Sequence, residues 1–330
     1  MMKGLFLLDP GPYDMIYPEE ERSQIRQLVD IYAPLQTSEM VAHDPSILHE
    51  AEVIFSGWGC PTFTERLLNA APWLKIIFYG AGSIKGVVTD SFWARQIIIT
   101  SAYEANGIPV SEFTLAQILL SLKGYWWHVQ KFWDSNTWWD RLPAAGGFGS
   151  TVGLISLGMI GSMVAERLKT YELKVIAYDP YATQEIATRL NVRLCSLEEI
   201  FKTADVISLH TPWLPETVGM ITGAHFALMK TGATFINTAR GAIVNEAEMV
   251  AVLKQRPDLY ALLDVTYPEP PAIDSPLRGL PNIIISPHIA GPNPNECKRN
   301  GQYVIDELKR YLNGQPLRYA ISRDRAVIMA

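Results

Sequence analysis

The sequence of 330 residues predicts an α/β protein with two doubly wound parallel-sheet domains, and three observations support this fold class. Short apolar runs alternate with amphipathic stretches along the whole chain, which is the pattern of parallel strands connected by helices. One apolar run, beginning at Thr151, passes through a glycine turn directly into a helical segment. The length suits two domains, and an apolar fraction of 48% is sufficient for two cores.

The predicted strands fall into two series, which do not align as an internal repeat. The strands of the first series are residues 5–8, 31–33, 53–57, 75–79 and 97–100. Helices such as 19–29 and 64–71 follow them. The strands of the second series begin at 151 and continue with 175–179, 206–210, 234–237, 262–265 and 283–286. Short apolar runs of this length, bounded by turn residues, are typical of buried parallel strands.

Two further helices bear on the domain organisation. One is predicted at 110–127, with Pro109 in its first turn, where the missing N–H has no partner in any case. The other is predicted at 293–313 and has no strand partner in the second series. We expect this last helix to return to the first domain. The first domain would then consist of residues 1–101 and 300–330, and the second of residues 102–299.

Composition excludes several classes of protein. The apolar run at the N-terminus is cut by Asp9 and Pro10, so it predicts a strand rather than a signal peptide. No apolar run is long enough to span a bilayer. Cys60, Cys195 and Cys297 are scattered without metal-ligand spacing, which favours reduced thiols in the cytoplasm and no metal site. A net charge of −6 without basic blocks argues against nucleic acid and anionic membranes as partners.

The glycine turn has the features of a dinucleotide-binding site. Gly158 would let the backbone approach a pyrophosphate, Gly161 would allow close packing of strand and helix, and the helix N-terminus would supply N–H donors. The next strand ends on Asp179, whose carboxylate can accept hydrogen bonds from ribose hydroxyls and would repel a 2′-phosphate. The sequence therefore predicts NAD rather than NADP. Ser156 replaces the first glycine of the pattern, and serine can occupy this position if its φ stays negative.

Three polar residues follow strands of the second series, where open α/β sheets bind their ligands. Arg240 offers a planar pair of donors for an α-keto carboxylate, His288 can donate a proton to a forming alkoxide, and Glu269 can keep that histidine charged. Taken singly, these residues could equally be a strand-end ion pair, a buried core histidine and a solvated loop carboxylate. Together they suit transfer of a hydride and a proton to a carboxylated carbonyl.

Five strings give the chain a clear resemblance to a known family. They are GAG from Gly80, HTPWLPET from His210, NTARG from Asn237, DVTYPEP from Asp264 and SPHIAG from Ser286. In their order and spacing the chain resembles the D-isomer-specific 2-hydroxyacid dehydrogenases, including their glyoxylate/hydroxypyruvate reductase and phosphoglycerate dehydrogenase-like members. The resemblance covers nearly the whole chain. It implies two Rossmann-like domains, with a discontinuous, flavodoxin-like substrate domain and an NAD-binding domain.

The resemblance also implies an activity and the residues that carry it. The chain would interconvert a 2-keto acid and a D-2-hydroxy acid by hydride transfer with NAD(H). Arg240 would bind the carboxylate and carbonyl of the substrate, His288 would be the acid/base, and Glu269 would be its partner. The substrate carboxylate would also bind the backbone N–H groups of Ala81, Gly82 and Ser83.

The cofactor would be surrounded by residues of the second series. The glycine turn would hold the pyrophosphate, the segment after residues 206–210 would line the adenine side, and the segment after 234–237 would hold the nicotinamide together with Asp264. The full set that the resemblance implies is Ser156, Gly158, Met159, Ile160, Gly161, Asp179, His210, Thr211, Pro212, Thr217, Thr238, Asp264 and Gly291.

An aromatic cluster follows the helix at 110–127. It consists of Trp126, Trp127, Phe132, Trp133, Trp138 and Trp139. Such residues could fill a core, but we favour a subunit interface, because aromatic residues are enriched at contact centres and a mostly polar loop rarely hides so many. Dimers of the resembled family use this part of the chain, so a homodimer through residues 125–148 is expected.

The chain departs from the family pattern at two further positions. Met159 stands where many relatives carry Arg or Lys, and the loss of that cation is expected to weaken pyrophosphate binding. Lys85 near the substrate turn could pair with a second acidic group of the substrate or could be a solvated surface lysine. Glyoxylate, hydroxypyruvate and sugar-acid derivatives all remain open as substrates.

Three alternatives were weighed against the dehydrogenase. The family includes NAD-sensing corepressors that retain the same residues, but these carry extra interaction tails that we do not expect here. The formate-oxidising branch has an amide where this chain has Glu269. A methyltransferase shares the glycine-rich strand and the strand-end acid, yet it does not need the set of Arg, Glu and His.

Overall fold

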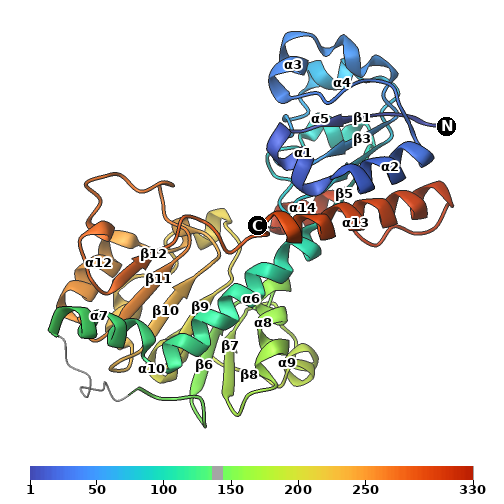
Figure 1. Cartoon of the computed structure of the whole chain (residues 1–330). Helices are drawn as coiled ribbons and strands as arrows, with labels where there is room; N and C mark the ends of the chain where they lie inside the picture. The colour runs from blue at the N-terminus through green and yellow to red at the C-terminus, as the bar shows by residue number, and fades with distance from the viewer. Residues whose placement is uncertain (136–143, 330) are drawn as a thin grey trace. The chain divides into compact units, whose positions relative to one another are not determined.

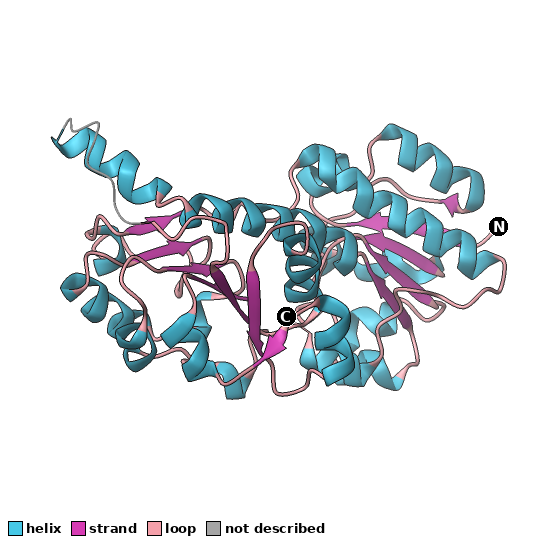
Figure 2. Ribbon diagram, turned by 90° about the horizontal axis from the view of Figure 1, so that it is seen from below, coloured by secondary structure: helices cyan, strands magenta, loops and turns pink. Residues whose placement is uncertain are grey.

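The computed structural model describes residues 1–135 and 144–329, and it confirms the α/β class. The chain forms two compact units: the first is Met1–Gly107 with Pro292–Ala330, and the second is Ile108–Gly291. Among the described residues, the first unit holds a sheet of five strands and the second a sheet of seven (Figure 1). All strand pairs are parallel, and helices lie on both faces of each sheet (Figure 2).

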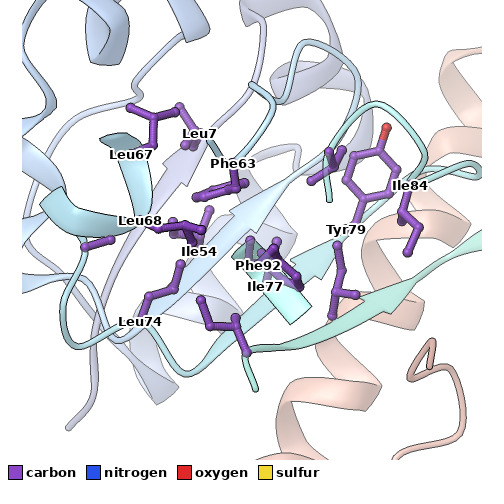
Figure 3. Close-up of a cluster of buried hydrophobic side chains, with 14 of the residues drawn as sticks. Leu7, Ile54, Phe63, Leu67, Leu68, Leu74, Ile77, Tyr79, Ile84 and Phe92 are labelled. Atoms are coloured by element: carbon purple, nitrogen blue, oxygen red, sulfur yellow. The ribbon is translucent and has the colours of Figure 1, made fainter. Parts of the chain in front are cut away.

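The sheet of the first unit has the strand order β2-β1-β3-β4-β5. Its strands are β1 (Lys3–Leu7), β2 (Asp30–Ile31), β3 (Val53–Ser56), β4 (Ile76–Tyr79) and β5 (Ile98–Ser101). Side chains alternate between the two faces of a strand, so the central strands contribute to two cores. Leu7, Ile54 and Ile77 lie in one core (Figure 3), whereas Phe6 and Phe55 lie in the other.

Helices and one 3₁₀ helix complete the first unit. They are α1 (Pro10–Ile16), α2 (Glu19–Leu28), α3 (Ser38–His43), η1 (Pro45–Glu50), α4 (Glu65–Ala70), α5 (Asp90–Ala94), α13 (Pro294–Leu312) and α14 (Arg323–Ile328). The long helix α13 belongs to this unit, as the sequence predicts. It begins after Asn293, which forms a reciprocal capping box with Glu296.

The domain boundaries differ from those predicted at 101/102 and 299/300. Cys297, in the first turn of α13, is fully buried in the core that contains Phe6 and Phe55. Helix α13 therefore packs on the sheet of the first unit from its beginning, and that unit resumes at Pro292.

The sheet of the second unit has the order β12-β11-β10-β9-β6-β7-β8. Its strands are β6 (Thr151–Ile155), β7 (Lys174–Tyr178), β8 (Arg193–Leu194), β9 (Val206–Leu209), β10 (Thr234–Asn237), β11 (Tyr260–Leu263) and β12 (Ile283–Ile285). The predicted strands agree with the observed ones to within two residues at each end. The sequence analysis missed β8, which pairs only at its two residues with β7.

The connections of the second unit are mostly helical. They contain α8 (Met159–Leu168), α9 (Gln184–Leu190), α10 (Leu197–Thr203), η2 (Pro215–Thr217), α11 (Gly223–Leu228), η3 (Gly241–Ile243), α12 (Glu246–Gln255) and η4 (Pro276–Arg278). The crossovers place the carboxyl ends of all the strands at one edge of the sheet, because the sheet is parallel. None of the helices in residues 1–135 and 144–329 has the length and apolarity that a bilayer span requires.

The predicted helix at 110–127 is wrong at both ends. Helix α6 (Tyr103–Leu122) contains Pro109 in its interior, and α7 (Tyr125–Ser135) is a separate helix. Helical bonding starts earlier because the Asn106 N–H donates to the Ala102 carbonyl directly after β5. The two helices are separated at Gly124, whose φ of +62° suits glycine.

The beginning of the aromatic segment is therefore helical and not a polar loop. Trp126, Trp127 and Phe132 belong to α7, and Trp126 packs against the core beneath α8 and β6. The side chain of Trp133, and residues 136–143 with both remaining tryptophans, lie outside the described part of the chain. The predicted interface through 125–148 stays a prediction.

Candidate functional site

The glycine turn joins β6 to α8 at the centre of the seven-stranded sheet, where the connections reverse direction. A Cβ atom at Gly161 would lie 2.1 Å from the Ser156 carbonyl oxygen, so only glycine allows the helix to pack this closely on the turn. A Cβ atom at Gly158 would meet only the Ser156 hydroxyl, at 3.8 Å. Protein packing does not require glycine at 158, so the space above this residue is open to a ligand.

Ser156 does not have the negative φ on which the prediction for serine at this position depended. Its φ is +79°, in the region that glycine adopts without strain. The Ser156 N–H donates to the Tyr178 carbonyl at 2.7 Å, and its hydroxyl donates to Asp179 Oδ2 at 3.3 Å. These two bonds to the end of β7 stabilise a conformation that is otherwise unfavourable for serine.

Asp179 anchors the same turn. Its Oδ2 accepts a hydrogen bond from the Leu157 N–H at 2.7 Å, and its Oδ1 accepts bonds from the N–H groups of Tyr181 and Ala182 at 2.8 and 3.1 Å. The carboxylate is therefore held beside the turn at the end of the neighbouring strand. This is the position from which an acid can reach the ribose of a dinucleotide.

The segment after β9 packs against the glycine turn. The His210 Cβ would lie 3.5 Å from a Cβ at Gly161, and its Nε2 is 3.0 Å from the Ser208 hydroxyl. Burial lowers the pKa of His210 to about 4, so this imidazole is neutral at neutral pH. Thr211 is buried, and Pro212 accepts a bond through its carbonyl from the Thr217 hydroxyl at 2.7 Å.

Two of the predicted cofactor residues make local structural contacts. The Thr217 hydroxyl also accepts a bond from the Leu214 N–H at 2.9 Å, so it shapes the loop around η2. The buried hydroxyls of Thr238 and Thr114 are 3.0 Å apart and join the end of β10 to α6. Met159 and Ile160 open α8, and Gly291 is the last residue of the second unit.

Arg240 follows β10 in a turn that Asn237 organises. The Asn237 Oδ1 accepts a bond from the Ala239 N–H at 2.9 Å, and its Nδ2 donates to the Arg240 carbonyl at 3.0 Å. The guanidinium donates through Nη1 to the Ala239 carbonyl at 2.6 Å. Burial lowers the pKa of Arg240, and the charge of Glu269 opposes this effect. Among the described residues, no ion pair joins Arg240 to a carboxylate.

Glu269 and His288 are in direct contact. The Glu269 Oε1 lies 2.6 Å from His288 Nδ1, and the two side chains are 40% and 47% exposed. A carboxylate at this distance orients the ring. The pairing leaves Nε2 as the nitrogen that can exchange a proton with a substrate.

Asp264 holds the loop that carries His288. It is 3% exposed; its Oδ1 accepts bonds from the Ser286 hydroxyl at 2.6 Å and the Ile289 N–H at 2.9 Å, and its Oδ2 accepts one from the Ala290 N–H at 2.9 Å. The His288 N–H donates to the Asp264 carbonyl at 2.9 Å. Both carboxylate oxygens thus hold the loop in which His288 has a φ of +52°.

The turn after β4, in the first unit, is a separate candidate for anion binding. The Ser101 hydroxyl lies 2.8 Å from the Ala81 carbonyl oxygen and 2.5 Å from that of Gly82, and Asn300 Nδ2 donates to the Gly80 carbonyl at 3.1 Å. Among the hydrogen bonds of the described residues, none is donated by the N–H groups of residues 81–83. With its carbonyls engaged and its amides available, the turn is suited to bind a carboxylate.

The second unit therefore carries two features along one edge of its sheet. One is the glycine turn at residues 156–161, which we call the dinucleotide turn, and the other is the polar set of Arg240, Glu269 and His288. A sequence model of the D-isomer specific 2-hydroxyacid dehydrogenase NAD binding domain matches residues 116–290, more than half of the chain. The chain belongs to the D-isomer-specific 2-hydroxyacid dehydrogenase family. It contains the NAD-binding domain of that family, and all of the matched residues lie in the second unit.

Known members of the family resemble the chain over most of its length. D-3-phosphoglycerate dehydrogenase of Methanocaldococcus jannaschii is 32% identical over 317 residues, which are 95% of this chain and 58% of that protein. The enzyme of the same name from Archaeoglobus fulgidus is 30% identical over 89% of this chain and 55% of its own length. The chain thus spans little more than half the length of these relatives.

A solved structure extends the likeness to three dimensions. D-lactate dehydrogenase from Aquifex aeolicus, complexed with NAD and lactic acid, is 26% identical to the chain. It aligns with a TM-score of 0.71 over 94% of this chain and 96% of its own. The chain therefore shares its fold with this D-lactate dehydrogenase.

Several residues at the site of this family member escaped the sequence analysis. Ser101 and Asn300 hold the carbonyls of the turn at 80–82, and Glu246 holds the loop before Glu269 through the Tyr267 N–H at 2.9 Å. Each belongs to an element remote in sequence from the segment that it holds. No spacing pattern in the sequence could have pointed to them.

Proposed function

We propose that the chain interconverts a 2-keto acid and a D-2-hydroxy acid with NAD(H). The observation that carries this proposal is the 2.6 Å contact between Glu269 Oε1 and His288 Nδ1, on the same sheet edge as Arg240 and the dinucleotide turn. An acid/base histidine with a carboxylate partner, beside a cation for the substrate carboxylate, suits carbonyl reduction. The names of the relatives, which are 2-hydroxyacid dehydrogenases, support the same reaction.

The residues of the second unit fit NAD. The open space above Gly158 suits a pyrophosphate, the N-terminus of α8 presents N–H donors towards it, and the Asp179 carboxylate suits an unphosphorylated ribose. Bound NAD(H) would supply or accept the hydride. Asp179 would also disfavour NADP by repelling its 2′-phosphate.

Each residue of the polar set would have a distinct role in reduction. Arg240 would bind the substrate carboxylate and polarise the carbonyl. His288 would donate the proton from Nε2 to the forming alkoxide. Glu269 would stabilise the imidazolium before this transfer and, in the oxidative direction, after it. Asp264 would keep His288 in place through the loop bonds described above.

The experiment that tests this proposal is NADH oxidation at neutral pH with a panel of 2-keto acids, from glyoxylate and pyruvate to branched, aromatic and dicarboxylic ones, with NADPH in parallel. The variant His288→Ala should lose roughly two to four orders of magnitude in kcat and still bind NADH, as measured by fluorescence. His43→Ala, at the exposed end of α3, is the matched control. Near-wild-type turnover of His288→Ala would refute the role of this histidine.

If the wild-type chain binds NADH but oxidises it with none of the 2-keto acids, the dehydrogenase proposal is refuted for these substrates. This result would favour the NAD-sensing alternative. A homodimer through residues 125–148 is part of our proposal, supported by the aromatic side chains of α7. Light scattering coupled to size-exclusion chromatography measures it directly, and a monomer at micromolar concentration would contradict it.

A further inference from the structure

We infer that Glu246 is a positioning residue that holds the Glu269 loop in place for proton transfer by His288. The inference rests on the proposed function, because it concerns the geometry of the Glu269–His288 pair. Glu246 itself is the first residue of α12, directly after the helix N-cap Asn245. It reaches across to a different segment of the chain.

The contact is a hydrogen bond to the backbone of the loop. Glu246 Oε1 accepts it from the Tyr267 N–H at 2.9 Å, two residues before Glu269. The Asn245 side chain caps α12 by accepting a bond from the Glu248 N–H, so the helix does not depend on Glu246 for its cap. The Glu246 carboxylate is therefore available to bind the neighbouring loop.

The loop has few hydrogen bonds to other elements, and its other side-chain contact in the described part of the chain is the edge-on packing of the Tyr267 ring against Trp213, with 5.5 Å between ring centroids. In the described part of the chain, two hydrogen bonds tie residues 265–270 to other elements: Tyr267 to Glu246, and Glu269 to His288. The bond from the Thr266 hydroxyl to the Pro268 carbonyl is internal to the loop. Prolines at 268 and 270 have no N–H to donate. If Glu246 releases the loop, the Glu269–His288 pair is the remaining hydrogen bond to other elements.

A second contact of the loop shows in which direction the Glu246 hydrogen bond restricts its movement. The backbone at Thr266 and Tyr267 lies directly on Gly241, where a Cβ would be 2.1 Å from the Thr266 carbonyl carbon and 2.5 Å from the Tyr267 nitrogen. Gly241 thus limits how closely the loop can approach the Arg240 turn. The Glu246 bond prevents the loop from moving away, and the two contacts together determine the position of Glu269.

Hydrogen exchange measured by mass spectrometry tests the contact without relying on activity. Between 267 and 271 only Tyr267 and Glu269 have an amide hydrogen, since the other three residues are prolines. Exchange in this segment therefore reports almost directly on the bond to Glu246. We expect Glu246→Ala to accelerate it about tenfold, the effect of losing one hydrogen bond of ordinary net strength. Glu246→Gln keeps an acceptor oxygen and should stay within about twofold of the wild type.

Kinetics of the same full-length variants test the consequence. In Glu246→Ala we expect kcat to fall at least about tenfold while the KM for NADH changes much less, because among the described residues no hydrogen bond joins the turn at 156–161 to this loop. Glu246→Gln should restore kcat to within about threefold of the wild type. Glu185→Ala, an exposed acid at the start of α9, is the control for loss of a helix-terminal charge.

The outcomes separate the two proposals. Unchanged exchange in Glu246→Ala, or accelerated exchange with unchanged kcat, would overturn the role of Glu246. A parallel loss in kcat and in NADH affinity, not rescued by Gln, would indicate a general structural defect and would also overturn it. A wild-type chain without turnover would instead refute the proposed function, and the exchange measurement would still decide whether Glu246 holds the loop.

Discussion

At Gly241 the Arg240 turn lies directly against the backbone of the Glu269 loop. A substitution there tests whether this contact sets the catalytic geometry. In Gly241→Ala the new Cβ would lie 2.1 Å from the Thr266 carbonyl carbon and 2.4 Å from the Thr266 carbonyl oxygen. Ordinary van der Waals contact begins at 3.4 Å, so the loop has to retreat by about 1.3 Å. Both partners are backbone, and no side-chain rotation can relieve the clash.

The expected consequence is larger for catalysis than for folding. A displacement of about 1 Å in a catalytic group can reduce the rate by roughly 10²-fold, so kcat should fall by about this factor. Overpacking of this kind usually lowers the free energy of unfolding by about 1–3 kcal/mol. NADH affinity should fall less than kcat, because the turn that would hold the pyrophosphate lies after β6, and only the predicted nicotinamide residues Thr238 and Asp264 lie beside β10 and β11.

Three measurements on the same preparation check this prediction: kcat with the best 2-keto acid of the panel, NADH affinity by fluorescence, and the urea midpoint. Gly279→Ala is the control, since its Cβ would meet only the Pro276 carbonyl oxygen, at a comfortable 3.8 Å. A Gly241→Ala variant with kcat within twofold of the wild type would show that the contact between loop and turn does not set the catalytic geometry.

Four other predictions concern the cofactor site, the Glu269–His288 pair and the pH dependence of stability. Gly161→Ala should raise the KM for NADH at least about tenfold with a smaller effect on kcat, because its Cβ would displace the turn that binds the pyrophosphate; an unchanged KM would contradict this. Asp179→Ala should weaken NADH binding and relax the preference for NADH over NADPH. The ratio of the affinities for NADH and NADPH is the informative readout. The Asp179 carboxylate also anchors the turn, so its loss is expected to weaken the binding of both cofactors. Glu269→Gln removes the charge 2.6 Å from His288 Nδ1, so kcat should fall by roughly two orders of magnitude; a kcat within about twofold of the wild type would remove Glu269 from this role. Finally, burial raises the pKa of Glu246 from 4.5 to about 7. The stability that protonated Glu246 contributes is fully present below about pH 4.5 and is lost as the pH rises to about 7. Glutamine does not titrate, so the free energy of unfolding of Glu246→Gln, measured with urea, should rise relative to that of the wild type between these two pH values.

The sequence alone determined the fold class, the positions of most strands and the identity of the family. These features are local: buried parallel strands are short apolar runs, and the family strings occupy consecutive positions at strand ends. The prediction that Arg240, Glu269 and His288 follow neighbouring strands needed only the order of β10, β11 and β12 along the chain. The return of α13 to the first unit could be predicted because no strand of the second series could partner that helix.

The tertiary structure decided everything that depends on contacts between distant segments. It placed Ser156 at a positive φ because two bonds from the end of β7 hold it there, which no pattern at residue 156 could show. It started α6 before Pro109, since helical bonding begins at the end of β5. It assigned both oxygens of Asp264 to the loop of His288.

The same physical reason separates the residues of the polar set from those that support them. Arg240, Glu269 and His288 are recognisable because their chemistry requires particular side chains at strand ends. Glu246 and Gly241 act through contacts with the backbone of the loop at 266–267, which lies roughly twenty to twenty-five residues away along the chain. A carboxylate at a helix start and a glycine in a turn are common in any sequence, so only the folded chain distinguishes these two from their many equivalents.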